Sequence, residues 1–331
     1  MAKSGSGGET QRTVLVAGAA NIVVLLAKLV AGVLTGSSAM LAEAAHSFAD
    51  TLNQAFLFTS VRQGARPADR THQFGYGQER YFWSLLAAFG IFVAGAGFSI
   101  FEGILSLHTQ THSYLIAYVV LGVCAVAEGT SLIRATHQVS GEARRDQTEL
   151  IEHVKTSPDT TVKAALFEDT AAVIGLALAA AGLLLEQLTG SPVFDGAASI
   201  AIGVLLIVVA VRLGLDSRDL LIGRAADPKL QQLIRDEIEG TPGVDRLLEL
   251  QTMHMGPDSL IVAARVDLSD ESRGDQVENL AEDIDRRLAE RLPVSAHVFI
   301  DPTPGGRQAP DESAPGSAGP VSPGSPARSA G

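Results

Sequence analysis

The chain has 331 residues, of which 46% are hydrophobic, and a formal net charge of -12. This acidic balance disfavours a nucleic-acid-binding protein and suits a partner of cations. The single cysteine, Cys124, excludes an intramolecular disulfide and a cysteine cluster for metal.

Six apolar blocks precede about residue 216, and each is long enough for the roughly 20 helical residues that a bilayer core requires. They lie at about residues 13–34, 38–61, 81–107, 114–136, 161–186 and 194–215. Soluble proteins rarely carry six such segments. The pattern predicts a six-helix transmembrane domain over residues 13–216, preceded by a polar N-terminal tail over 1–12. The first block is too long for a secretory signal peptide and lacks its small-residue cleavage site.

The loops between these blocks differ in charge. The loops after blocks one, three and five contain no Lys or Arg, whereas the other loops carry several, among them Arg62, Arg66, Arg70, Arg80, Arg134, Arg144, Arg145, Lys155 and Lys163. Positive residues stay on the cytoplasmic side of a membrane. The sequence therefore predicts that both termini are cytoplasmic.

The second block contains ionisable residues where lipid or a packed core would be expected. In LAEAAHSFAD (41–50), His46 and Asp50 are four residues apart, so a helix places them on one face. An imidazole nitrogen and a carboxylate oxygen stacked in this way can hold a cation, and such groups normally face a bundle interior or a wet cavity. The alternative is that the pair only bonds helices together. Glu43 fits cavity lining and structural bonding equally.

The fifth block begins with a second acidic pair in ALFEDTAA (165–172). Adjacent helical residues diverge by about 100°, so we predict Asp169 as a ligand and Glu168 as a flanking or alternate ligand. The alternative is that both acids mark a helix N-terminus. His46, Asp50 and Asp169, with Glu168 as the candidate fourth, would offer nitrogen and oxygen ligands suited to zinc. Because His46 must lose its proton to ligate, metal capture and proton release are linked.

A soluble module follows over residues 226–302, with 17 acidic and 8 basic residues. Asp227-Pro228 is typical of a helix start, and alternation over 260–268 predicts a strand. The predicted order is αββαβ, a small α+β domain of ferredoxin-like type, with one sheet face left open for a second copy. Residues 303–331 are mostly Pro, Gly, Ser and Ala and are predicted to be disordered.

These features together resemble the cation diffusion facilitator family of metal–proton antiporters. The stretches 34–54, 74–86, 167–175 and 253–260 are similar to its branch containing zinc transporter nine, and the resemblance covers about residues 12–302. It implies a homodimeric exporter of zinc with protons as counter-substrate and no permanently bound cofactor.

The chain departs from that family at two places. Position 165 is alanine where zinc-carrying members have histidine, so the fourth ligand could come from Glu168, water or a residue such as Asn21. The tail lacks the usual histidines, with Glu278 and Phe299 roughly in their places, so a binuclear tail site is not expected. His254 is the possible substitute, although a lone histidine at a strand end more often packs.

We therefore expect a divalent cation exporter in the plasma membrane that works by alternating access. Its partners would be the metal ion, protons, lipid and a second copy, and not nucleic acid. The alternatives are an exporter of manganese, iron or cobalt, favoured by oxygen ligands around a single histidine, and a metal-sensing scaffold that no longer transports. An enzyme is disfavoured because the chain has no His-Glu-x-x-His run.

Overall fold

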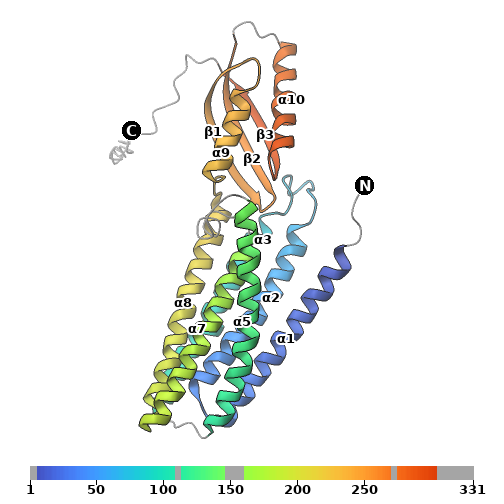
Figure 1. Ribbon diagram of the computed structural model, residues 1–331. Coiled ribbons are helices and arrows are strands. Elements are labelled where there is room, and N and C mark those ends of the chain that lie inside the picture. The colour runs from blue at the N-terminus through green and yellow to red at the C-terminus, as the bar shows by residue number, and fades with distance from the viewer. Residues whose placement is uncertain (1–5, 109–112, 146–159, 270–273, 304–331) are drawn as a thin grey trace, which may run out of the picture.

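The computed structural model describes residues 6–108, 113–145, 160–269 and 274–303. A bundle of long helices forms one part of the molecule and a small α+β domain forms the other (Figure 1). The bundle contains a rod of three consecutive helical segments and five further long helices. The rod is α3 (Glu79–Gly90), the π-helical stretch η1 (Ile91–Gly97) and α4 (Phe98–Leu105), followed by the short 3-10 helix η2 (Ser106–His108); the other helices are α1 (Ser6–Thr35), α2 (Ser38–Gly64), α5 (Tyr114–Arg145), α7 (Thr160–Thr189) and α8 (Val193–Ile222).

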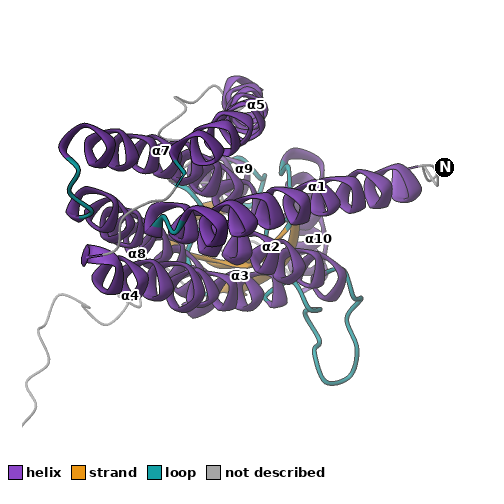
Figure 2. Ribbon diagram, turned by 90° about the horizontal axis from the view of Figure 1, so that it is seen from below, coloured by secondary structure: helices purple, strands orange, loops and turns teal. Residues whose placement is uncertain are grey.

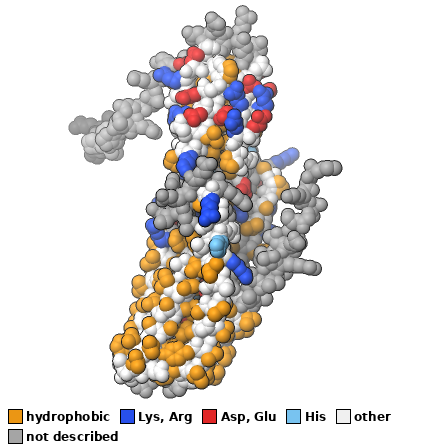
Figure 3. All heavy atoms as spheres, in the orientation of Figure 1, with side chains coloured by type: hydrophobic (Ala, Val, Ile, Leu, Met, Phe, Trp, Pro, Cys, Tyr) orange, Lys and Arg blue, Asp and Glu red, His pale blue; other side chains and the backbone are white. Residues whose placement is uncertain are grey.

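Within the described residues, four segments are long and apolar enough to cross a membrane: Glu79–Leu105, Tyr114–Gly141, Lys163–Thr189 and Val193–Ile222. In α1 the side chains are described from Asn21 onward, and this part, Asn21–Thr35, is apolar. Helix α2 is more polar because it carries the LAEAAHSFAD segment. In Figure 3, hydrophobic side chains cover the lower half of the bundle and charged side chains gather above it. The helix-rich membrane domain is confirmed, while its count of six crossings stays a prediction. Helix α1 begins at Ser6, inside the stretch expected to be a polar tail.

Helix α2 is the interior element of the bundle. It packs against α1, α3, η1, α4, α7 and α8, and Figure 2 shows it between α1 and the α3–α4 rod. Its small residues Ala39, Ala42 and Ala49 are fully buried, which allows neighbouring helices to approach closely. Glu43 and His46 of α2 are consequently carried into the protein interior and away from lipid.

The C-terminal domain has the predicted order of elements: α9 (Pro228–Glu239), β1 (Val244–Gly256), β2 (Ser259–Leu268), α10 (Gly274–Arg291) and β3 (Ser295–Pro302). The side chain of Asp227 caps α9 by accepting hydrogen bonds from the backbone N–H groups of Lys229 (2.9 Å) and Leu230 (3.0 Å). Strand β2 lies in the middle of the sheet, antiparallel to β1 and parallel to β3. With three strands described, the finer comparison with a ferredoxin-like sheet stays a prediction.

The two faces of this sheet differ. The inward residues of β2 alternate along the strand and pack with α9 and α10 in one core: Leu260, Val262, Ala264 and Val266. The other face carries Arg265, which donates to Asp301 (3.0 Å) and to Glu249 (3.1 Å), and Phe299, which is 52% exposed. One sheet face therefore lacks a helical cover within the described residues. Of the tail predicted to be disordered, the structure describes Thr303 alone.

The C-terminal domain contacts the bundle through the β1–β2 hairpin and the loop before α3. At this contact Gly77 and Gly256 meet backbone to backbone: a Cβ on Gly77 would overlap the carbonyl oxygen of Met255, and a Cβ on Gly256 would lie 3.0 Å from the Cα of Gly77. The rings of Phe74 and His297 add an edge contact at 5.4 Å between centroids. The hairpin turn is thus seated directly on the segment that leads into α3.

Candidate metal site

The centre of α2 holds a buried histidine–carboxylate pair. The Nε2 atom of His46 lies 3.6 Å from Oδ2 of Asp50, and His46 is 1% exposed. Both imidazole nitrogens of His46 and Oδ1 of Asp50 are buried without a hydrogen-bond partner in the described part of the chain. Buried polar atoms without a hydrogen-bond partner lower the stability of a folded protein. Their concentration at His46 and Asp50 fits a site that binds a cation.

The two acids of α7 point in different directions. The amide of Asn53, one turn after Asp50, donates a hydrogen bond to Oε1 of Glu168, which is buried. The hydroxyl of Ser131 on α5 donates instead to Oδ2 of Asp169 at 2.9 Å. Glu168 therefore faces α2, whereas Asp169 is held by α5, as the divergence of adjacent helical residues requires.

The structure brings His46 and Asp50 together but does not assemble the whole predicted ligand set. Among the described residues, no three His, Cys, Asp or Glu side chains lie close enough to hold a metal ion. Ala165, at the position where the resemblance implies histidine, is exposed, and Asn21 on α1 is half-buried. The roles of Asp169 and Glu168 as ligands remain predictions.

Two contacts between α2 and α7 bracket the His46–Asp50 pair. Toward the start of α2, the carboxylate of Glu43 abuts Gly175, where a Cβ would overlap Oε1 of Glu43. Toward its end, Asn53 bonds Glu168. The helices are therefore antiparallel here. Between these contacts α7 carries two small buried residues, Ala171 and Ala172.

A second charged cluster lies about one helical turn before His46 on α2. The ammonium of Lys28 on α1 lies 3.1 Å from Oε2 of Glu43 and 3.5 Å from Oε1 of Glu128 on α5. Of the two cations that could pair with Glu128, Lys28 and Arg134, the structure pairs it with Lys28. Of the two interpretations of Glu43, structural bonding is the one that the geometry favours. Spacing in the sequence could not reveal the cluster, because its members come from three helices.

Asp195, which the sequence did not single out, accepts hydrogen bonds from the first residues of α2. It lies in the first turn of α8 and accepts hydrogen bonds from Ser37 Oγ (2.7 Å), Ser38 N (2.6 Å), Ser38 Oγ (2.9 Å) and Ala39 N (3.3 Å). An acidic residue within an apolar run was the signal that the sequence offered. Its partners, more than 150 positions earlier in the chain, were not readable.

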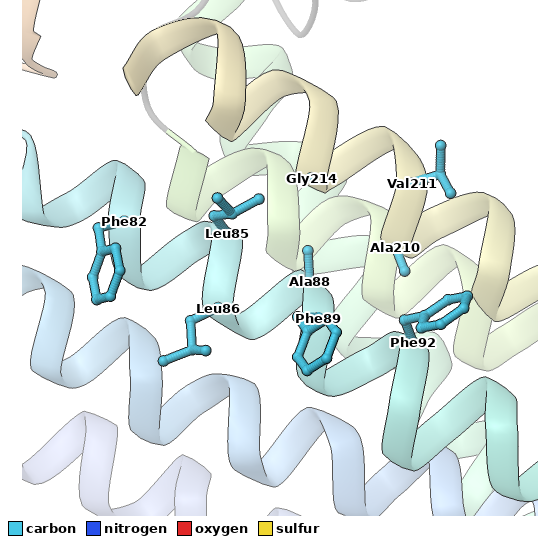
Figure 4. A pocket seen from close by; sticks show the side chains of 9 residues that line it. All are labelled: Phe82, Leu85, Leu86, Ala88, Phe89, Phe92, Ala210, Val211 and Gly214. Atoms are coloured by element: carbon cyan, nitrogen blue, oxygen red, sulfur yellow. The ribbon is translucent and has the colours of Figure 1, made fainter. Parts of the chain in front are cut away.

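A groove on the bundle surface is apolar throughout. It has a volume of about 480 Å³ and lies between α8 and the α3 and η1 segments of the rod. Its lining includes Phe82, Phe89 and Phe92 (Figure 4). No ionisable side chain lines it, so it cannot be the cation site. The polar groups that could bind a cation lie inside the bundle.

In the C-terminal domain, His254 is a buried strand residue. It is 5% exposed, its backbone N–H donates to the carbonyl oxygen of Arg224 at 3.0 Å, and its Nδ1 atom has no hydrogen-bond partner among the described residues. Burial lowers the pKa of His254 below its usual value, and the positive charge of Arg224 lowers it further. This environment fits a neutral packing histidine.

The fold and the site define an integral membrane protein with buried polar and ionisable side chains inside its helical bundle. Residues 14–222 match the cation efflux transmembrane domain family, and the chain belongs to this cation efflux family. The resemblance to cation diffusion facilitators is therefore confirmed. Membership of a transporter family is also consistent with a protein that is not an enzyme.

The chain is similar to several named members. It is 37% identical over 258 residues to the "Proton-coupled zinc antiporter SLC30A9, mitochondrial" of Xenopus laevis, which covers 77% of this chain and 46% of that protein. It is 35% identical over 262 residues to "Metal tolerance protein C4" of Arabidopsis thaliana (78% and 57%). It is 29% identical over 293 residues to "Cation-efflux pump FieF" of Serratia proteamaculans (86% and 91%). The chain thus spans about half the length of the first two relatives.

These relatives correct one prediction. The expected location in the plasma membrane is wrong, because the SLC30A9 relatives are named as mitochondrial proteins. The charge bias of the loops reports which way a membrane protein is inserted and carries no information on which membrane receives it.

Proposed function

We propose that this protein exports zinc across a membrane in exchange for protons, moving the metal away from the side that carries the C-terminal domain. The observation that carries the proposal is the buried His46–Asp50 pair with its unpaired nitrogen and oxygen atoms. The names of the SLC30A9 relatives, which are zinc antiporters and mitochondrial, support the substrate, the exchange and a mitochondrial membrane.

His46 and Asp50 would bind the metal from α2, while Asp169 and Glu168 would complete the site from α7. In the described conformation Ser131 and Asn53 hold those two carboxylates. Binding would exchange these hydrogen bonds for bonds to the metal, so α2 and α7 would have to shift relative to each other. His46 ligates only as the neutral imidazole, and protons arriving from the far side would therefore displace the metal.

The rest of the proposed assembly follows the same logic. α1, α2, the α3–α4 rod, α5, α7 and α8 would make six crossings, because the interior position of α2 shields its polar residues from lipid. A second copy would cover the open sheet face around Phe299 and Arg265.

His46→Ala tests the proposal. We expect it to abolish zinc-driven proton movement in vesicles reconstituted with purified protein, because the only nitrogen ligand of the proposed set is removed. His137→Ala is the matched control, since His137 is an exposed histidine on α5, and its exchange should equal that of the wild type. Normal exchange by a folded His46→Ala protein would refute the mechanism. A panel of zinc, manganese, iron and cobalt in the same assay identifies the preferred ion, and no flux of any ion by the wild type would favour a metal-sensing scaffold.

A further inference from the structure

Burying the charged cluster of Lys28, Glu43 and Glu128 costs free energy, and a purely structural role does not account for that cost. Lys28 and Glu43 are both 0% exposed at their side chains, and Glu128 is 18% exposed. Replacing a buried ion pair by apolar side chains of similar volume is often neutral or stabilising. A cluster of this kind inside a membrane domain therefore calls for a functional reason.

Its position connects it to both halves of the candidate metal site. Glu43 precedes His46 by three residues on α2, and Glu128 precedes Ser131, the partner of Asp169, by three residues on α5. Residues three apart lie on neighbouring parts of a helix surface. The ammonium of Lys28 thus occupies a point between two carboxylates, each one helical turn from a group of the site.

The oxygen atoms around Lys28 would attract a metal ion if the ammonium were absent. Oε2 of Glu43 and Oε1 of Glu128 both face Nζ of Lys28, and Oε1 of Glu43 is buried without a hydrogen-bond partner in the described residues. Carboxylate oxygens with no nitrogen among them suit harder cations such as Mn²⁺, whereas imidazole favours Zn²⁺. The tethered ammonium fills this oxygen-rich position.

We propose that Lys28 is a specificity-determining residue that occupies a second, all-carboxylate cation position and so confines divalent ions to the histidine-containing site. This rests on the proposed export of zinc for its biological meaning, but its test does not. Lys28 contributes no ligand. It acts by denying Glu43 and Glu128 to a competing ion.

The test is equilibrium binding of Mn²⁺ to the purified full chain in detergent, measured by calorimetry. We expect Lys28→Met to gain one Mn²⁺ site per chain, or to bind Mn²⁺ at least about tenfold more tightly than the wild type. Lys28→Gln is the second neutral variant, because its amide can still donate to the carboxylates if Lys28→Met does not fold. Lys28→Arg retains the charge and should bind Mn²⁺ as the wild type does.

Two further variants locate the gain. Lys28→Met combined with Glu43→Gln should lose the new Mn²⁺ site, because one of its two carboxylates is gone. Lys163→Met is the matched control, since Lys163 is another buried lysine of the membrane domain, 3.4 Å from Asp216, and should gain no site. Unchanged Mn²⁺ binding in folded Lys28→Met or Lys28→Gln overturns the inference, as does a gain that survives Glu43→Gln.

Zinc flux by the wild type, measured in parallel, tests the proposed function separately. A wild type that moves no zinc would refute the export proposal and leave the Mn²⁺ measurement fully interpretable. Zinc flux with no gain of Mn²⁺ binding in the Lys28 variants would refute the role of Lys28 alone.

Discussion

Gly175 is the residue on which the fit between α2 and α7 depends most directly. In a helix interior, alanine normally stabilises relative to glycine by about 1 kcal/mol. Here a Cβ would overlap Oε1 of Glu43. That oxygen ends a flexible side chain, but the other oxygen of the same carboxylate is held by Lys28 in a fully buried position. Glu43 can therefore yield only by giving up its ion pair.

We expect Gly175→Ala to lower the stability of the folded protein by roughly 1–2 kcal/mol, because the overpacking outweighs the gain in helix propensity. Thermal unfolding of the purified protein in detergent measures this. Gly129→Ala on α5 is the control: nothing lies within 4 Å of its would-be Cβ, so it should be neutral or slightly stabilising. Equal midpoints for the two variants would contradict the expectation.

The part of the candidate site that depends on local helix geometry could be predicted from the sequence. The spacing of His46 and Asp50 is enough to place them together, because a helix fixes the relation between i and i+4. It could not show that Asn53 holds Glu168 while Ser131 holds Asp169. These bonds depend on how α5 and α7 are rotated within the bundle, and a single sequence contains no direct record of that rotation.

At the scale of elements, Asp195 fastens two helices end to end. Its carboxylate accepts from two hydroxyls and two backbone N–H groups at the start of α2, where helix N-termini leave N–H groups unsatisfied and attract negative charge. The first turn of α8 therefore sets the position of the first turn of α2. Movement of either end carries the other with it.

Asp195→Ala should destabilise the protein by about 2–3 kcal/mol, because it leaves several buried donors without an acceptor. Hydrogen exchange should rise first in residues 37–41, and the thermal midpoint should fall. Glu102→Gln provides the comparison, since Glu102 accepts from Ser106 close by in the same rod (3.1 Å) and its substitution should change neither measurement appreciably. Unaltered exchange at the start of α2 in Asp195→Ala would show that the cap is dispensable.

Helices and strands whose ends are marked by local sequence signals were predictable. The start of α9 follows from Asp227-Pro228, a signal that acts within a few residues. The π-helical stretch at Ile91–Gly97 was not predicted. Within it, Gly95 faces Leu206 of α8 and Ala49 of α2, a juxtaposition that cannot be read from local sequence.

At the scale of the whole molecule, the buried His254 makes the C-terminal domain sensitive to acid. Its pKa in the folded protein lies below the ordinary value of 6.5, so the unfolded chain binds a proton more readily than the folded one. The titration of His254 therefore leaves the free energy of unfolding unchanged at pH values well above 6.5, the ordinary pKa of histidine. It lowers that free energy as the pH falls below this value. Arg224 adds to this penalty, and Asp227 opposes it.

His254→Gln should remove this part of the acid sensitivity. We expect the wild type to lose more protection in β1 than the variant between about pH 7.5 and pH 5.5, where an unperturbed histidine titrates. Each tenfold reduction in the proton affinity of the folded state corresponds to about 1.4 kcal/mol. Hydrogen exchange of the full chain at the two pH values measures the difference. Identical losses in both proteins would place the sensitivity elsewhere.

The meeting of Gly77 and Gly256 has a consequence for how the two parts of the molecule communicate. Main chain touches main chain there, so no side chain can flex to absorb a displacement of the hairpin. A tilt of the C-terminal domain, from whatever source, must push or drag the segment entering α3 and, through that rod, the helix that carries His46. The C-terminal domain is therefore coupled directly, main chain to main chain, to the helical bundle at this contact.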